Sequence, residues 1–103
     1  MPDWVGFEIG PYLKDYLLRC LEDSVFDLLS SEDQRKPFER MLRFLDKTHW
    51  ERLGQIVESG RGVSVSAAWF ILCHLSGTPR EGFPRREQVG RAKKWWDENR
   101  SRK

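Results

Sequence analysis

Val63-Ser-Val-Ser-Ala-Ala-Trp-Phe-Ile-Leu-Cys-His-Leu75 is the stretch that decides the fold of this chain. It carries no charged side chain when His74 is neutral, and from Val65 to Leu75 its apolar residues surround every side of a helical wheel. A helix that is apolar all round is either buried at the centre of a domain or spans a membrane. This one is shorter than the roughly 20 residues that a span requires. We therefore predict a buried central helix over 64–75.

The length and composition of the chain indicate one soluble domain. Its 103 residues are 39% hydrophobic and 33% charged, and shorter pieces could not each bury a core of their own. Thirteen aromatic residues supply much of that core, since each buries roughly 150–250 Å². We predict a single domain over 1–103, with an extended arm at 1–10 and a basic tail at 100–103.

Helical spacing of apolar residues predicts four further helices around the central one, and Val89, Ala92 and Trp96 form the inward side of the last. Thr48 and Glu51 match a capping box, and Pro37 and Pro84 match the proline that opens a helix. Ser31 with Gln34 also fits a cap, but we place a turn at 31–36 because a proline inside a helix removes a hydrogen bond. The predicted fold class is all-α, a compact bundle of about five helices near 11–29, 37–46, 49–59, 64–75 and 85–99. A break in the first helix near Asp23 is the alternative there.

Residues 67–100 resemble the closing repeat of bacterial HEAT-like helical-repeat proteins. The matching positions are Ala67, Ala68, Leu72, Leu75, Ser76, Gly77, Gly82, Phe83, Trp95, Trp96, Glu98 and Asn99. The resemblance implies stacked helical hairpins, a scaffold role without catalysis, and a Trp95-Trp96 pair that caps one edge of the core. Fewer than three repeats seldom stand alone as a solenoid, so a compact five-helix domain is the alternative.

The side chains that carry catalytic chemistry are few in this sequence. Cys73 and His74 are neighbours, but adjacent residues on a helix point about 100° apart and do not form a nucleophile–base pair. We predict that Cys73 and His74 belong to the core, that His49 is a surface residue, and that Cys20 and Cys73 are reduced thiols of a cytoplasmic protein. No cysteine and histidine spacing matches a metal site. The prediction is a non-enzymatic protein with no cofactor.

The first third of the chain is acidic and supplies the predicted protein-binding surface. Residues 1–34 carry eight acids and two bases, a net charge of −6. An inhibitor-type or scaffold domain would use such a surface to dock a basic partner. The candidate partner-binding residues are Trp4, Phe7, Glu22, Asp23 and Asp27. The structural alternative is that the aromatics cover the core and the acids form an ordinary solvated face.

The last part of the chain is basic and supplies the alternative function, a nucleic-acid-binding accessory role. Residues 79–103 carry nine bases and four acids, a net charge of +5. Basic groups neutralise phosphates and an aromatic ring can stack on a base. The candidate residues in 85–103 are Arg85, Arg86, Arg91, Lys93, Lys94, Trp95 and Arg100. The near-neutral charge of the whole chain, +2, argues against this function and leaves another protein as the expected partner. We expect no membrane partner, since no apolar run is long enough to span.

Overall fold

The computed structural model describes the backbone of residues 10–101 and the side chains of residues 15–101, and it contains only helices and loops in that range. The all-α prediction with five helices is therefore confirmed. The helices are α1 (Gly10–Glu22), α2 (Ser31–Phe44), α3 (Trp50–Ser59), α4 (Val63–Leu75) and α5 (Val89–Asn99), with short 3-10 turns at η2 (Phe26–Leu28), η3 (Lys47–His49) and η4 (Arg86–Gln88). The predicted arm at 1–10 lies outside the described residues except for Gly10, which begins α1.

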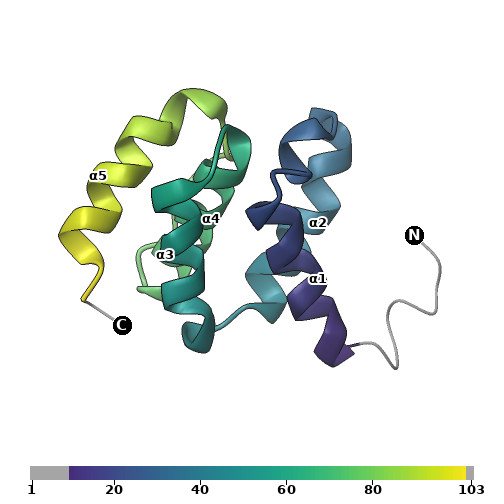
Figure 1. Ribbon diagram of the computed structural model, residues 1–103, viewed down its shortest axis with the longest axis horizontal. Coiled ribbons are helices and arrows are strands. Elements are labelled where there is room, and N and C mark those ends of the chain that lie inside the picture. The colour runs from purple at the N-terminus through teal and green to yellow at the C-terminus, as the bar shows by residue number, and fades with distance from the viewer. Residues whose placement is uncertain (1–9, 102–103) are drawn as a thin grey trace.

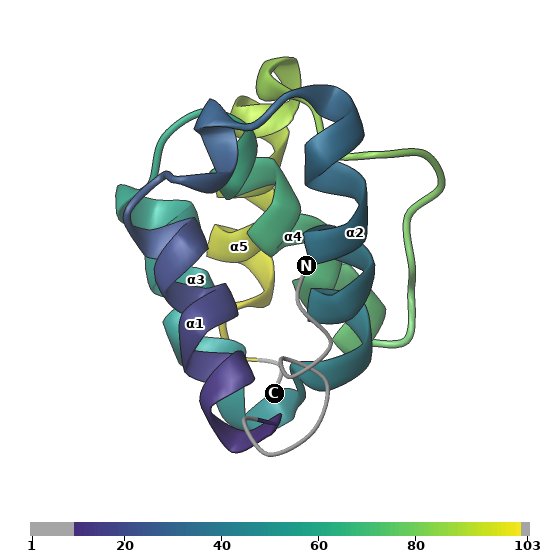
Figure 2. The same ribbon diagram turned by 90° about the vertical axis from the view of Figure 1, so that its right-hand side faces the viewer.

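The five helices are arranged in three layers along the long axis of the molecule (Figure 1). The α1–α2 pair lies at one end, α3 and α4 lie in the middle, and α5 lies at the other end. Turned by 90°, the molecule shows α1 and α2 side by side in front of α4 and α5 (Figure 2). Because α4 contacts all four of the other helices, it occupies the central position that its sequence predicts. None of the described helices is both long and apolar enough to cross a membrane.

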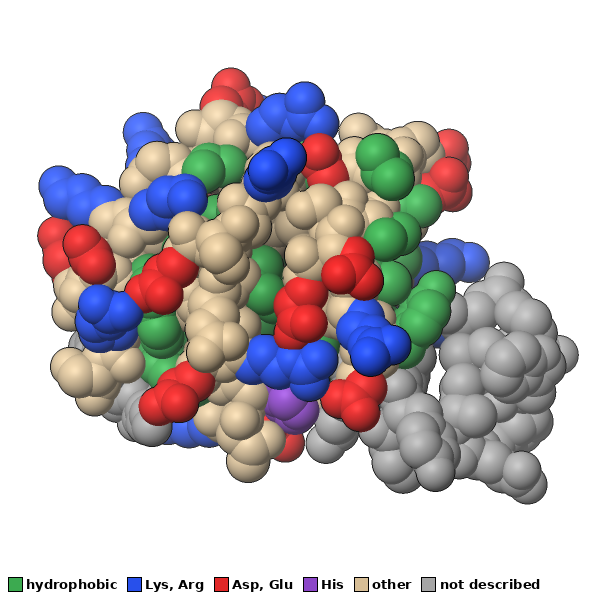
Figure 3. All heavy atoms as spheres, viewed as in Figure 1, with side chains coloured by type: hydrophobic (Ala, Val, Ile, Leu, Met, Phe, Trp, Pro, Cys, Tyr) green, Lys and Arg blue, Asp and Glu red, His purple; other side chains and the backbone are tan. Residues whose placement is uncertain are grey.

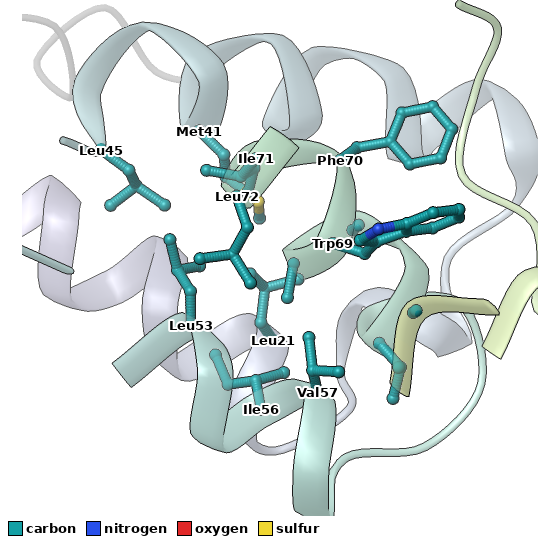
Figure 4. Packing of buried hydrophobic residues seen from close by; sticks show 14 of the residues in the cluster. Leu21, Met41, Leu45, Leu53, Ile56, Val57, Trp69, Phe70, Ile71 and Leu72 are labelled. Atoms are coloured by element: carbon teal, nitrogen blue, oxygen red, sulfur yellow. The ribbon is translucent and has the colours of Figure 1, made fainter. Parts of the chain in front are cut away.

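The middle of α4 is buried on every side. All residues from Ser64 to Cys73 are buried, as an unbroken apolar helix requires. Leu72 points towards Leu21 of α1 and Leu53 of α3, whereas Phe70 points to the other side of the helix (Figure 4). Neighbouring helices therefore cover α4 from opposite directions, which closes the bundle around it.

α4 ends at Leu75, as predicted, and Ser76-Gly77 follow it. Gly77 has a φ of +87°, a value that favours glycine because it has no Cβ. The Gly77 N–H donates to the His74 carbonyl at 3.2 Å, and the Thr78 N–H donates to the Cys73 carbonyl at 3.0 Å. These two bonds form a Schellman motif, which satisfies carbonyls that the end of the helix leaves unpaired.

The boundaries predicted for the first two helices are wrong in part. α1 ends at Glu22 and not at 29, which matches the alternative of a break near Asp23. α2 begins at Ser31 and not at Pro37, because Ser30 caps it by accepting the Asp33 N–H at 3.2 Å. Pro37 lies inside this helix and removes one backbone hydrogen bond, a loss that the cap and the buried face of α2 outweigh.

The cap predicted at Thr48 and Glu51 is also wrong. Asp46 caps the turn η3 by accepting the Thr48 N–H at 3.0 Å, and the His49 ring accepts the Asp46 N–H at 3.1 Å. This reciprocal arrangement is a capping box in which histidine replaces the usual glutamate. His49 is accordingly half-buried rather than a free surface residue.

Tryptophans join α5 to α3. The rings of Trp95 and Trp96 lie 6.0 and 5.9 Å from that of Trp50, measured between ring centroids. The Trp96 indole N–H donates to the Glu58 carboxylate at 2.9 Å, so its polar atom is satisfied while its ring is buried. Val89, Ala92 and Trp96 form the inward side of α5, as predicted: Ala92 and Trp96 are buried and Val89 is partly buried. Trp96 also lies against Gly54, where an added Cβ would approach the indole to 1.9 Å.

Candidate functional site

The most exposed large apolar side chains of the described residues include three from one short segment between α1 and α2. Val25 is 43% exposed, Leu28 is 83% exposed and Leu29 is 36% exposed. Apolar residues that lie in contiguous exposed patches mark interaction sites, whereas single ones are ordinary. We call these three residues the η2 patch. Tyr16 on α1 is also exposed.

The η2 patch faces outward because the residues between its members face inward. α1 ends at Glu22, and Ser24 then adopts a φ of +57°, so the chain leaves the helix direction. Phe26 is completely buried and holds the turn against the core. The buried Gln34 amide donates to the carbonyls of Phe26 and Leu29, at 3.1 Å each. The patch is therefore a fixed feature of the fold.

Asp27 links the same turn to α4, which lies far from it in the sequence. Its carboxylate accepts the Val63 N–H at 3.0 Å, which places a negative charge at the N-terminus of α4, where the helix dipole favours it. Arg86 donates to both carboxylate oxygens, at 3.0 and 2.9 Å. Gly62, with a φ of +59°, leaves room for this contact, since a Cβ there would lie 2.5 Å from an Asp27 oxygen. Asp27 is thus engaged within the molecule.

Replacing Asp27 with Ala should lower the free energy of unfolding by about 1–3 kcal/mol, because α4 loses a cap and Arg86 loses its partner. Replacing Arg86 with Ala should cost no more than about 1 kcal/mol, since its side chain is largely exposed and such pairs are screened by solvent. Urea unfolding of the two variants measures the difference. Equal losses would show that the bond to Val63 contributes nothing to stability.

Acidic side chains lie on both sides of the η2 patch in the sequence. Residues 21–34 contain five acids and no base. Glu22 pairs with Arg52 of α3, and Asp27 pairs with Arg86. Asp23, Glu32 and Asp33 are exposed and form no ion pair with a described basic residue. Figure 3 shows green hydrophobic side chains on the α1–η2 side of the molecule, with acidic groups beside them near the top.

The residues predicted for this surface thus have different roles in the structure. Asp23 lies next to the η2 patch and is free, whereas Glu22 and Asp27 hold other elements of the fold together. Trp4 and Phe7 lie outside the described residues. Leu28 was not among the predicted residues, because one continuous helix was predicted over 11–29. The sequence feature that could have identified Leu28 is the possible helix break near Asp23, because a chain that leaves the helix there can turn Leu28 outward.

The predicted nucleic-acid-binding residues are mostly engaged within the molecule. Arg100 pairs with Glu58, Lys93 donates to the Glu58 carbonyl at 3.2 Å, and Arg85 lies 3.8 Å from Glu87. Arg86 is held by Asp27, and Trp95 is half-buried against Trp50. Among the described residues of α5, the exposed bases that form no ion pair or hydrogen bond are Arg91 and Lys94.

A group of basic residues on α2 was not predicted from the sequence. Lys36, Arg40 and Arg43 recur at intervals of four and three residues, which places them on one side of the helix, and Lys47 follows in η3. The spacing is visible in the sequence, but it is obscured when the helix is taken to start at Pro37. Glu39 lies among them, so the group is not uniformly positive.

The cysteines and histidines do not form a reactive pair. Cys73 is buried in the core, as predicted, but His74 is exposed, so the prediction that both belong to the core is wrong for His74. Burial raises the pKa of the Cys73 thiol to about 11 and also raises the pKa of the Cys20 thiol. Because the thiolate is the nucleophile, both shifts disfavour the reactive form of the thiol. The described residues contain no cluster of three or more metal-ligating side chains.

Comparison with known proteins assigns no family to this chain. No protein-family model matches the sequence, and no curated protein or solved structure is similar enough to count as a match. The surface chemistry of the described residues is therefore the basis for a functional inference.

Proposed function

We propose that this protein is a small, non-enzymatic interaction domain that binds another protein through the η2 patch. The observation that carries the proposal is the exposure of Leu28, at 83%, beside Val25 and Leu29. A leucine so exposed gains roughly 1.5–3 kcal/mol when it is fully buried. A partner that covers the patch provides that burial.

The rigidity of the turn supports the same proposal. Ordering a mobile loop lowers affinity by about 0.5–1.5 kcal/mol for each immobilised side chain. Phe26, Gln34 and Asp27 already fix the turn, so a partner does not have to order its backbone. The fold thus holds its apolar residues in water in a binding-ready conformation.

A HEAT-like scaffold role for residues 67–100 is part of this proposal. It is supported by α4 and α5, the two helices to which this segment belongs, which pack against each other, as in a helical hairpin. Cytoplasmic localisation is supported by Cys20 and Cys73, which are both free thiols and so suit a reducing compartment.

Replacing Leu28 with Ser should leave the fold intact and reduce partner binding at least tenfold. Surface substitutions usually change stability by less than about 0.5 kcal/mol, so the thermal midpoint should move by no more than about 4 °C. The measurement is the affinity of a partner that the wild-type protein captures from its source cell. Lys94→Ser, at the opposite end of the molecule, is the matched surface control. Equal binding by wild-type and Leu28→Ser proteins would remove the η2 patch from the proposal.

A nucleic-acid-binding accessory role is the second candidate, and the exposed Arg91 and Lys94 favour it. Each lost phosphate contact lowers the slope of log affinity against log salt by about 0.7 for single strands. If the leading proposal is right, a variant with Gln at 91, 93 and 94 should elute from immobilised single-stranded DNA at the same salt concentration as the wild type. A variant with Gln at 36 and 43 on α2 and at 47 on η3 removes the same charge and is the control. Earlier elution of the α5 variant alone would favour the second candidate.

A further inference from the structure

We propose that the η2 patch binds an amphipathic helix of another protein, with an apolar stripe flanked by lysine or arginine. This inference rests on the proposed function and names the chemistry of its partner. On this protein, Val25, Leu28 and Leu29 would contact the apolar stripe of the partner helix. Asp23, Glu32 and Asp33 would contact its basic residues.

The length of the apolar surface fits a helix. Val25, Leu28 and Leu29 lie within five consecutive residues around the turn η2. Tyr16 lies six residues before the end of α1, about 9 Å along its axis, and is 58% exposed. Hydrophobic side chains continue along this side of the molecule in Figure 3. A partner helix offers apolar side chains at intervals of three and four residues, and two or three of its turns would span this length.

The charge around the patch selects a basic partner. Of the five acids in residues 21–34, Glu22 and Asp27 are neutralised by Arg52 and Arg86. Asp23, Glu32 and Asp33 remain exposed, on either side of the patch in the sequence. Complementary charge at the rim of an interface speeds association and excludes partners of the wrong sign. Three exposed carboxylates close to the patch in the sequence therefore favour lysine and arginine at the edges of the partner helix.

The same charges argue against other binding partners at the η2 patch. A second copy of the chain, related by a two-fold axis, would bring the same acidic residues towards one another. Nucleic acids and anionic lipid surfaces are negative and would be repelled by Asp23, Glu32 and Asp33.

The experiment uses two synthetic helical peptides of 18 residues, as probes, with the same leucine stripe. One has lysine at its polar positions, and its twin has glutamate. Titration of the full protein into each fluorescently labelled peptide gives the affinity at low and at physiological salt. We expect the lysine peptide to bind at least tenfold more tightly than its twin, and to weaken as salt rises, because exposed charges are screened.

Two protein variants test the roles of the patch and its rim. Leu28→Ser should lower the affinity for the lysine peptide at least tenfold. The triple variant Asp23→Asn, Glu32→Gln, Asp33→Asn should lower this affinity about tenfold and reduce its dependence on salt. The matched control is Glu39→Gln, Glu81→Gln, Glu98→Gln, which removes three exposed acids elsewhere and should leave the affinity unchanged.

Each contrary result has a distinct meaning. If both peptides bind equally and Leu28→Ser weakens both, the η2 patch is a docking site but the partner is not specifically basic, so this inference fails alone. If Leu28→Ser does not alter binding, the patch is not the site, and the proposed function fails with the inference. No binding of the lysine peptide, or equal losses in the two triple variants, also overturns the basic-helix partner.

Discussion

Leu72→Asp should unfold the domain. Leu72 is completely buried and points from α4 towards Leu21 and Leu53 (Figure 4). Removal of a buried leucine side chain costs about 2–5 kcal/mol, and an unpaired buried carboxylate adds several kcal/mol more. The total loss is comparable with the roughly 5–15 kcal/mol free energy of unfolding of a typical domain. Circular dichroism should show loss of helix and no cooperative thermal transition.

Leu72→Met is the control for this experiment. Methionine has a similar volume and no charge, so it should cost less than about 1.5 kcal/mol and keep a cooperative transition. Full helicity and cooperative melting in Leu72→Asp would mean that α4 is not the centre of the fold. Loss of structure in both variants would show that the site is sensitive to shape more than to charge.

Gly54→Ala should destabilise the protein by about 1–3 kcal/mol, although alanine is the better helix former. In an open helix this change stabilises by about 1 kcal/mol. At Gly54, however, the new Cβ would meet three ring atoms of Trp96, at 1.9 to 2.4 Å, so α5 must move away from α3. Overpacking of this kind outweighs helix propensity. The thermal midpoint should fall by at least about 4 °C.

Gly90→Ala in α5 is the matched control. No atom lies within 4 Å of the position that its Cβ would occupy, so helix propensity alone acts there. We expect a gain of up to about 1 kcal/mol. Stabilisation by both substitutions would mean that the α3–α5 contact is looser than the structure shows.

The centre of the fold is predictable from sequence, and its reason is local. α4 has no polar side that could face water, so its burial and the surrounding helices follow from its composition alone. The end of α4 at Gly77 and the inward side of α5 follow similarly from short patterns. These features depend on residues close together in the chain.

The boundaries that were predicted wrongly depend on which of several local signals prevails and on contacts between distant residues. α2 starts at Ser31 despite Pro37, because Ser30 caps it and Gln34 reaches back to Phe26 and Leu29. Helical spacing cannot show that the chain turns at Ser24 or that Asp27 is held by Val63 and Arg86, more than 30 residues away. For this reason the acidic character of the candidate surface was visible in the sequence, but its apolar centre at Leu28 was not.

The four described tryptophans all lie between residues 50 and 96, in α3, α4 and α5, whereas the η2 patch belongs to the α1–α2 end of the molecule (Figure 1). Intrinsic fluorescence from these rings consequently reports on one part of the domain. A partner that docks at Leu28 contacts none of these four rings, so we expect its binding to leave their emission unchanged. During unfolding the same asymmetry becomes useful. Tryptophan emission and a label at α1 would follow different helices, and coincident curves would demonstrate that all five melt as one cooperative unit.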